Sequence, residues 1–246
     1  KLELDPITDP DMLMFFERQV RGGVSMITTR HAEANNKYMK GYDEGKASSF
    51  IEYLDANNLY GYAMSQPLPV DKFKWMNFGQ LDNWQNVSCV LEVDLEYPEE
   101  LHDLHNDYPF CPERKDINGV KKLVPNLKDK ERYVIHHVAL KQALKHGLKF
   151  KNIYRGVMFN KSRALAVYID NNTKLRAEAK NEFEKDFFKL MNNSVFGKTM
   201  ENIRKRVNIK LVTSEDKARK IITQPNNETR TIFSEHLTAV HMKQTG

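Results

Sequence analysis

The chain has 246 residues, which is enough for one large domain or two small ones. Hydrophobic residues make up 40% and charged residues 29%, which excludes wholesale disorder, and no apolar run reaches the roughly 20 residues of a membrane-spanning helix. The two cysteines exclude a disulfide scaffold and a Cys-rich zinc site. The net charge of +5 permits an acidic partner such as nucleic acid without requiring one. Because the N-terminus has neither an initiator Met nor a signal peptide, we expect an intracellular piece of a longer chain with no membrane partner.

The first half of the chain alternates between predicted helices and strands. In chain order we expect a helix at 11–18, a loop at 30–46, a strand at 49–54, a helix at 59–64 and a strand at 87–96. Gly22-Gly23 ends the first helix. In the second strand Glu92, Asp94 and Glu96 share one face, an arrangement typical of a solvated surface and only rarely of a metal site.

The second half opens with a Pro-rich stretch. Residues 99–130 contain Pro109, Pro112 and Pro125 among many charges, which indicates a surface insertion with little core. The elements expected after it are a helix at 138–146, a strand at 149–159, helical structure at 162–200 interrupted at 192–194 and 197, a strand at 207–213 and a helix at 215–222. Cations crowd into one stretch, at positions 189, 198, 204, 205, 206 and 210. The mixture predicts an α+β fold.

The first candidate site is the segment from Tyr53 to Tyr60, with the sequence Tyr-Leu-Asp-Ala-Asn-Asn-Leu-Tyr. It places Asp55 at the end of an apolar strand and ahead of a tight turn. Such a carboxylate, with a nearby backbone carbonyl, could hold a hard cation. A strand-end Asp more often caps the next helix, so the spacing alone favours a structural role.

The second candidate site is the helical stretch from Lys189 to Lys198. Lys189, Asn193 and either Phe196 or Gly197 lie on one helix face, at spacings of four, seven and eight residues. These residues suit a nucleoside triphosphate: the lysine could contact the phosphates, and the aromatic ring beside a glycine without a side chain could accommodate the base. An amphipathic helix with a solvated lysine and a terminating glycine explains the same residues and is favoured when the stretch is considered alone.

Together, the two segments resemble motif A (Asp-x-x-Ser-Leu-Tyr-Pro) and motif B (Lys-x-x-x-Asn-Ser-x-Tyr-Gly) of family B DNA polymerases, in the family's order. The strings at 53–61 and 187–202 are particularly similar to those of the protein-primed branch, which includes polymerases of Polinton/Maverick transposons and of related viruses and linear plasmids. The resemblance runs from about Arg21 to the end of the chain. It implies an α+β fold, namely a partial polymerase palm with an inserted subdomain and helical fingers.

The resemblance also implies roles for the motif residues. Asp55 would bind both catalytic Mg²⁺ ions, which two-metal enzymes hold about 3.5–4 Å apart. Tyr60 would be the steric gate that rejects the ribose 2′-hydroxyl, and Lys189 would contact the incoming triphosphate. Asn193 and Phe196 would pack around the nascent base pair.

Further positions follow from the resemblance less directly. Gly197 would let the template base approach the helix, and Arg176 or Lys180 would add a second cation at the triphosphate, although a solvated helix face explains these two equally well. Val20-Arg21-Gly22-Gly23 resembles the Tyr-x-Gly-Gly motif that contacts single-stranded template, with Val20 in place of the aromatic residue. Arg21, Gly22 and Gly23, together with Lys198, are therefore the expected DNA-binding residues; the alternative for the glycine pair is a flexible helix stop.

Three motif positions depart from the family pattern. Asn58 replaces the motif A Ser, Gly61 replaces its Pro, and Phe196 replaces the motif B Tyr. All three resemble ordinary variation within the protein-primed branch. They leave Asp55, Tyr60 and Lys189 in place.

The resemblance divides the chain into four parts. Residues 1–71 would be the exonuclease-to-polymerase connector and the palm with motif A, and residues 72–168 an insertion that holds the terminal protein and primer duplex. Residues 169–206 would be the fingers with motif B. Residues 207–246 would begin a second insertion, linked to strand displacement and processivity, or return to the palm.

Motif C, Tyr-x-Asp-Thr-Asp-Ser, would supply the other carboxylate of the metal site and does not occur in this sequence. The only Asp-x-Asp is Asp9-Pro10-Asp11, which precedes motif A. We therefore expect motif C beyond Gly246, and expect the 246-residue chain to be inactive alone.

Two functions stay open at this point. The first is a segment of an active DNA polymerase, with template and primer DNA, deoxynucleoside triphosphates and a priming protein as partners. The second is a domesticated, catalytically inactive remnant that binds nucleic acid or nucleotide. A remnant should lose catalytic identities first, yet Asp55, Tyr60, Lys189 and Asn193 are intact, which favours the first.

Overall fold

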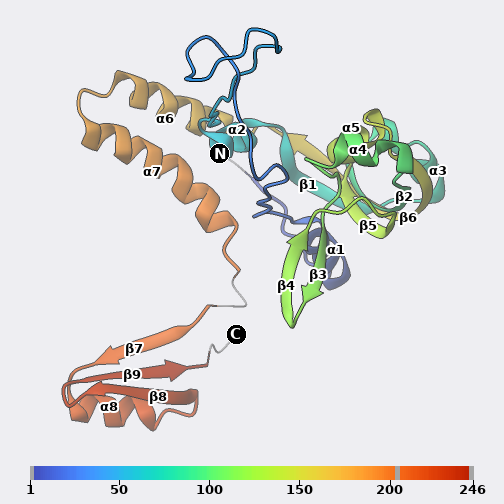
Figure 1. Ribbon diagram of the computed structural model, residues 1–246. Helices are drawn as coiled ribbons and strands as arrows, with labels where there is room; N and C mark the ends of the chain where they lie inside the picture. Colours follow the sequence, from blue (N-terminus) through green and yellow to red (C-terminus); the bar gives the residue numbers. More distant parts are fainter. Residues whose placement is uncertain (1–2, 203–205, 244–246) are drawn as a thin grey trace. The chain divides into compact units, whose positions relative to one another are not determined.

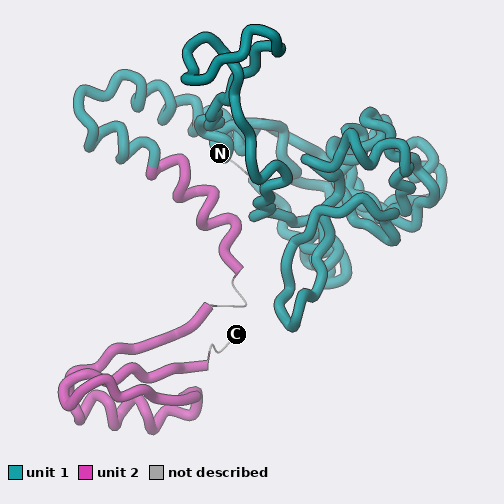
Figure 2. The backbone as a smooth tube through the Cα atoms, in the orientation of Figure 1, with its two compact units in different colours: residues 1–189 teal, residues 190–246 magenta. Residues whose placement is uncertain are grey.

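The computed structural model describes residues 3–202 and 206–243 and divides into two compact units, residues 1–189 and 190–246 (Figure 1, Figure 2). The first unit contains the helices α1 (Pro10–Gln19), α2 (Leu59–Ser65), α3 (Phe78–Asp82), α4 (His102–His105), α5 (His137–Lys145), α6 (Ala166–Glu178) and the start of α7 (Glu182–Thr199). Its strands are β1 (Leu68–Trp75), β2 (Cys89–Glu96), β3 (Glu113–Ile117), β4 (Val120–Val124), β5 (Lys130–His136) and β6 (Lys149–Ser162). This mixture confirms the predicted α+β class.

A four-stranded antiparallel sheet, in the order β1-β6-β2-β5, forms the core of the first unit. The inner strand β2 has buried apolar residues on both of its faces. Leu91 and its alternate neighbours pack towards α3 and α5, where Leu140 is fully buried. On the opposite face Val90 packs with Met12 and Phe15 of α1. Helices on both faces therefore remove β2 from solvent.

The acidic face of β2 differs from its prediction. Glu92 is only 1% exposed and lies among three guanidinium groups, those of Arg155 (2.7 Å), Arg18 (3.1 Å) and Arg132 (3.2 Å). Burial would raise the pKa of Glu92, but hydrogen bonds from Arg155 and Arg18 outweigh it and hold the pKa below its usual value. The prediction of a solvated face is thus wrong for Glu92, because α1 covers that side of the sheet and supplies Arg18.

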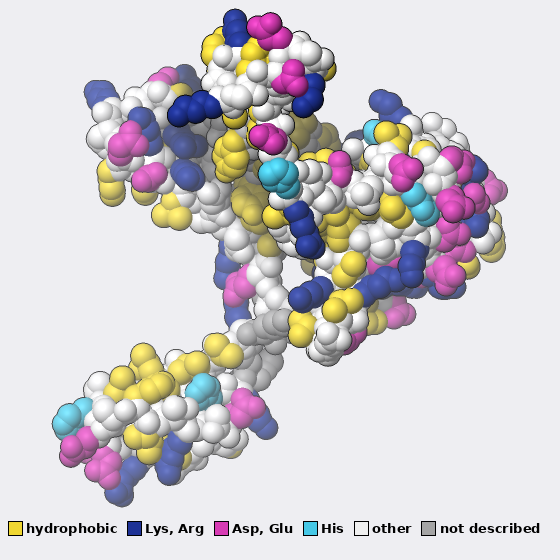
Figure 3. All heavy atoms as spheres, viewed as in Figure 1, with side chains coloured by type: hydrophobic (Ala, Val, Ile, Leu, Met, Phe, Trp, Pro, Cys, Tyr) yellow, Lys and Arg dark blue, Asp and Glu magenta, His cyan; other side chains and the backbone are white. Residues whose placement is uncertain are grey.

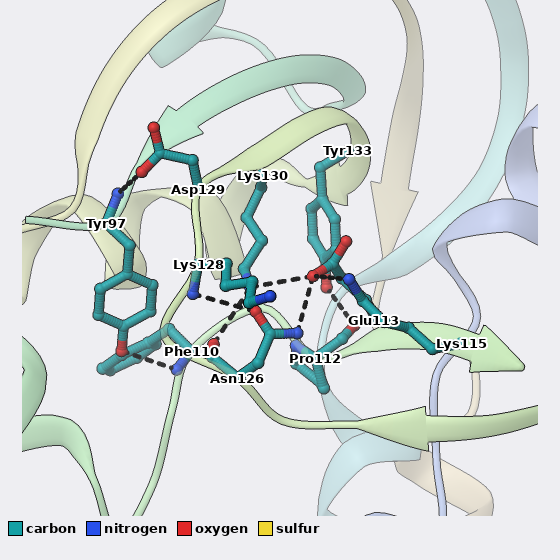
Figure 4. Close-up of polar contacts among 10 residues, drawn as sticks. All are labelled: Tyr97, Phe110, Pro112, Glu113, Lys115, Asn126, Lys128, Asp129, Lys130 and Tyr133. Carbon is teal, nitrogen blue, oxygen red and sulfur yellow. Dashed lines mark hydrogen bonds and ion pairs between the residues drawn. The ribbon is translucent and has the colours of Figure 1, made fainter. Parts of the chain in front are cut away.

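The Pro-rich stretch contains the exposed two-stranded hairpin β3–β4, and polar contacts hold the two ends of this hairpin (Figure 4). Lys130 is 1% exposed, and its Nζ donates to Asn126 Oδ1 at 2.7 Å and to Glu113 Oε2 at 3.3 Å. The Tyr133 hydroxyl donates to the Pro112 carbonyl at 2.9 Å. These contacts fix both ends of the hairpin to β5.

The second unit contains a three-stranded antiparallel sheet in the order β7-β9-β8, formed by β7 (Asn208–Val212), β9 (Leu237–Met242) and β8 (Asn227–Ser234). Helix α8 (Glu215–Ile222) covers one face, where Ile222 packs on a cluster around Val240. The strand predicted at 207–213 and the helix predicted at 215–222 are confirmed. Positions 204 and 205 of the basic stretch lie outside the described residues. None of the helices in the described parts of the chain is both long and apolar enough to cross a membrane.

Candidate functional site

The segment before α2 does not form the predicted strand. Residues 49–56 have no regular secondary structure, and Tyr53 is 96% and Leu54 83% exposed. A strand needs a neighbour for its backbone hydrogen bonds, and no described strand pairs with this segment. The side chains are β-prone, but they alone do not create a strand. Asp55 is exposed, and among the described residues its carboxylate has no hydrogen-bond or ion-pair partner.

The start of α2 excludes one of the two interpretations of Asp55, that of a helix cap. The residue in the N-cap position is Asn58, in the left-handed conformation with φ of +56°, so Asp55 does not cap this helix. The Asn58 side chain lies over Gly61, where an added Cβ would stand 2.4 Å from Asn58 Oδ1. Asn58 and Gly61 are two of the departures from motif A, and this contact couples them.

Tyr60 lies in the first turn of α2 and is 52% exposed (Figure 1). The opposite side of the helix is fixed: the Ser65 hydroxyl donates to the Gly61 carbonyl at 2.8 Å, and Arg163 Nε donates to the Ser65 carbonyl at 2.9 Å. This side of α2 packs against α6. The buried residues of α2 are Gly61, Met64 and Ser65, whereas Tyr60 is half-exposed.

The predicted helical region at 162–200 consists of two helices. Asn181 separates them, because its Oδ1 accepts from Glu184 N at 2.9 Å while Glu184 Oε2 accepts from Lys180 N at 2.8 Å. This is a variant of the capping box, because the carboxylate accepts from the residue before the N-cap; the signature, Asn followed three residues later by Glu, could have predicted the break. The interruptions predicted at 192–194 and at Gly197 are wrong, because α7 runs unbroken from Glu182 to Thr199.

The unbroken helix keeps the motif B residues on one face, as their spacing predicts. Lys189 is exposed, and its ammonium group has no hydrogen-bond or ion-pair partner among the described residues. Asn193 and Phe196 are half-buried. An added Cβ at Gly197 would have no neighbour within 4 Å. This glycine therefore does not serve packing inside the described structure, and it does not end the helix.

The remaining predicted cations differ in their surroundings. Arg176 and Lys180 are exposed around the end of α6. Lys198 forms an ion pair with Glu201 at 2.7 Å. A solvated helix face therefore remains an adequate explanation for all three.

Arg21 lies in a cleft of about 560 Å³ at the end of α1. Its guanidinium stacks over the Tyr133 ring at 3.9 Å, and the cleft is also lined by Arg18, Arg114 and Arg132. Helix α1 ends at Gln19 with Val20 as its C-cap, so the predicted helix stop at Gly22-Gly23 is wrong. Gly23 has φ of +79°, a conformation that favours glycine.

The described residues do not form a complete metal site. In the ranges 3–202 and 206–243 no group of three or more His, Cys, Asp or Glu side chains could hold a metal ion. Asp9, from the only Asp-x-Asp, caps α1 and accepts a hydrogen bond from Trp75 Nε1 at 3.1 Å. A two-ion site needs more carboxylates than Asp55 alone could supply.

With this geometry established, the chain can be compared with known proteins. The family described as DNA polymerase type B, organellar and viral, matches residues 35–244. The chain belongs to this family. The predicted resemblance to family B DNA polymerases is thus confirmed.

Similar structures support the same fold. Phi29 DNA polymerase in an orthorhombic crystal form, and the same enzyme complexed with primer-template DNA and incoming nucleotide substrates, each match with a TM-score of 0.51 and 16% identity. Each match covers 87% of this chain and 35% of the phi29 chain, so the chain spans about a third of that polymerase. No curated protein sequence matches the chain.

Proposed function

We propose that this chain is a segment of a protein-primed DNA-directed DNA polymerase, which adds deoxynucleotides to a primer terminus or to a priming protein. The observation that carries the proposal is the family match over residues 35–244, within which the motif A and motif B residues are intact. The unbroken α7 adds support, since it presents Lys189, Asn193 and Phe196 on one face. The partners are template and primer DNA, deoxynucleoside triphosphates and a terminal protein.

Asp55 is the proposed metal ligand. An exposed carboxylate with no hydrogen-bond or ion-pair partner in the described part of the chain is suited to Mg²⁺, which prefers oxygen ligands. When bound, such ions would stabilise the attacking and leaving oxygens of an in-line displacement. Because the described residues supply one carboxylate, the proposal is limited to Asp55 as one of several ligands.

The nucleotide would lie between the two motifs. Tyr60 would exclude the ribose 2′-hydroxyl with its ring, and Lys189 would stabilise the triphosphate by charge. Asn193 and Phe196 would contact the nascent base pair, and the bare backbone at Gly197 would admit the template base. Arg176 and Lys180 stay candidates for a second cation on the triphosphate.

The DNA and protein partners would engage the rest of the chain. Arg21, Gly22 and Gly23, with Lys198, are the proposed template contacts. Residues 72–168 would hold the terminal protein and primer duplex, and residues 207–246 would begin the second insertion. We propose a transposon, virus or linear plasmid as the source of the polymerase, and an intracellular location.

Primer extension by the protein that contains this chain tests the proposal. Asp55→Asn should abolish extension while template–primer binding persists, and the neighbouring exposed Glu52→Gln is its control. Lys189→Ala should raise KM for the nucleotide or lower kcat, whereas Lys185→Ala, one turn earlier on α7, should not. Tyr60→Val should admit ribonucleotides. Near-normal extension by Asp55→Asn would refute the proposal, and an inactive wild-type protein that still binds DNA would establish the remnant.

A further inference from the structure

Residues 35–49 form a closed loop between the template-contact candidates and motif A. Its ends meet where Ser49 N donates to the Asn35 carbonyl at 2.7 Å and Asn35 N donates to Ser49 Oγ at 3.0 Å. A surface segment with joined ends and its own internal contacts is an Ω-loop, a type of loop that frequently carries function.

The Asn35 side chain organises this loop. Its Nδ2 donates to three backbone carbonyls, those of Asp43 (3.0 Å), Ala47 (3.2 Å) and Lys46 (3.4 Å). Its Oδ1 accepts from Asp43 N at 3.0 Å. The amide of Asn35 therefore holds both ends of the returning segment of the loop, residues 43–47.

The Asn36 side chain holds the base of the loop and the start of its tip. It is only 6% exposed, and its Nδ2 donates to the Ser49 carbonyl at 3.0 Å while its Oδ1 accepts from Tyr38 N at 3.1 Å. The loop thus has a polar interior built from two adjacent asparagines. Because the backbone is already ordered, a ligand at the tip would pay little additional conformational entropy.

The tip presents Lys37, Tyr38, Met39 and Lys40 to solvent. Tyr38 is 78% exposed, and Lys37 Nζ lies 5.1 Å from the centroid of its ring. In Figure 3, the part of the molecule where Figure 1 draws the dark blue loop shows cationic, acidic and apolar side chains on its outer surface. The tip is therefore an open aromatic ring flanked by two cations.

The acidic residues of the loop lie on its returning part. Asp43 forms an ion pair with Lys46 at 3.2 Å, and its Oδ1 accepts from Gly45 N at 3.0 Å. Glu44 is exposed beside them. With Asp43 neutralised by Lys46, the cations at positions 37 and 40 outnumber the remaining acid.

We infer that this tip binds unpaired nucleotides of a DNA strand, with Tyr38 stacked on a base and Lys37 and Lys40 on the flanking phosphates. An aromatic face combined with cations is the general way in which proteins hold single strands without reading their sequence. The inference rests on the proposed polymerase function. The six residue steps from Ser49 to Asp55 span at most roughly 20 Å, so the base of the loop, where Ser49 lies, is within that distance of the candidate metal ligand.

Fluorescence anisotropy of the full 246-residue chain with labelled oligodeoxythymidylate tests the inference. Tyr38→Ala should raise Kd by about five- to a hundredfold, since base stacking on an aromatic ring has that magnitude. Tyr38→Phe should restore the affinity, because it keeps the ring. Tyr108→Ala, at another exposed tyrosine (85%), is the matched control and should change nothing.

Salt dependence tests the cations separately. The double variant Lys37→Ala/Lys40→Ala should flatten the slope of log K against log salt by about 1.4, because each phosphate contact on a single strand contributes about 0.7. Asn35→Ala should weaken binding together with faster proteolysis within 35–49. The double variant Lys145→Ala/Lys174→Ala, which removes two positive charges outside the loop, is the control for the loss of charge alone.

Three outcomes would overturn the inference: unchanged affinity in Tyr38→Ala, equal losses for single-stranded and fully duplex DNA, or photocrosslinks from 5-iodouracil DNA that avoid 37–40. Its failure is separable from that of the polymerase proposal. Primer extension that depends on Asp55, combined with unchanged affinity in Tyr38→Ala, would remove only the inference. Tip-dependent binding without extension would remove only the polymerase proposal.

Discussion

Replacing Glu92 with Gln is the most direct test of what joins α1 to the sheet. The carboxylate is 1% exposed and accepts from Arg18 of α1, from Arg132 of β5 and from Arg155 of β6. Glu92→Gln keeps the volume of the side chain and removes its charge. The NH₂ group of the Gln amide would also face the guanidinium N–H groups, and two hydrogen-bond donors that face each other cannot form a hydrogen bond.

The magnitude follows from the exposure of the partners. Removing one member of a fully buried ion pair costs about 3–5 kcal/mol. Here the three arginine side chains are 47%, 58% and 42% exposed, so water can solvate them after the charge is lost. We therefore expect a loss of about 2 kcal/mol in the free energy of unfolding. For a chain of this size that lowers Tm by about 4–8 °C.

Thermal unfolding followed by circular dichroism measures this loss. Glu96→Gln, on the same strand and face, is the control: Glu96 pairs with Lys149 at 3.4 Å and Lys151 at 3.5 Å and is 34% exposed. Because such surface pairs contribute little, this control should lose less than about 1 kcal/mol. Equal Tm values for the two variants would refute the reasoning.

The pH dependence gives a second check on the same variant. The folded pKa of Glu92 lies below its ordinary value of 4.5, so its stabilisation is fully present above pH 4.5 and is lost as the pH falls through the folded pKa. The difference in Tm between the wild type and Glu92→Gln should therefore shrink towards low pH. A difference that stays constant with pH would show that shape, rather than charge, matters at this position.

Three further substitutions address packing, motif B and acid stability. Gly156→Ala should destabilise the chain by about 1–3 kcal/mol in urea unfolding, because its Cβ would lie 2.6 Å from Leu91 Cδ2 and 3.1 Å from the Val90 carbonyl; an unchanged midpoint would contradict tight packing there. Gly197→Ala should stabilise α7 by about 1 kcal/mol yet reduce primer extension, and unchanged extension would contradict close approach of the template. Burial, with His137 and Lys161 nearby, lowers the pKa of His136 to about 4. The wild type should therefore lose stability as the pH falls below about 6.5, and His136→Asn should flatten that loss of Tm; an equally steep loss in the variant would contradict the role of His136.

Periodicity predicted the elements that are long or strongly patterned. The helix predicted at 59–64 and the strand predicted at 87–96 are confirmed by α2 and β2, whose ends differ from the predicted ends by at most two residues. The strands β1 and β5 were not predicted. β1 contains Pro69 and a left-handed Lys72, and it is an edge strand with register shifts against β6. An edge position tolerates proline, so the local sequence of such a strand resembles a loop.

Predictions for the candidate site failed where the decisive interaction is not local. The residues at 49–54 have the β-propensity of a strand, but propensity reports how side chains fit a sheet that already exists. Glu92 has the alternating pattern of a surface strand, and only the packing of α1 shows that this face is covered. By contrast, the break at Asn181 was local and predictable, since the contacts that cap α7 all lie between residues 180 and 184.

The Asn58–Gly61 contact explains why two motif A departures occur together. Asn58 turns the chain in the left-handed conformation, which Asn adopts more readily than most residues, and its side chain then occupies the space of a Cβ at position 61. The same four residues set the start of α2 and the direction in which Tyr60 projects. Helix α2 packs on α6, and α6 is followed along the chain by α7, the helix that carries motif B. Because a Cβ at position 61 would collide with the Asn58 side chain, this conformation of Asn58 requires glycine at position 61.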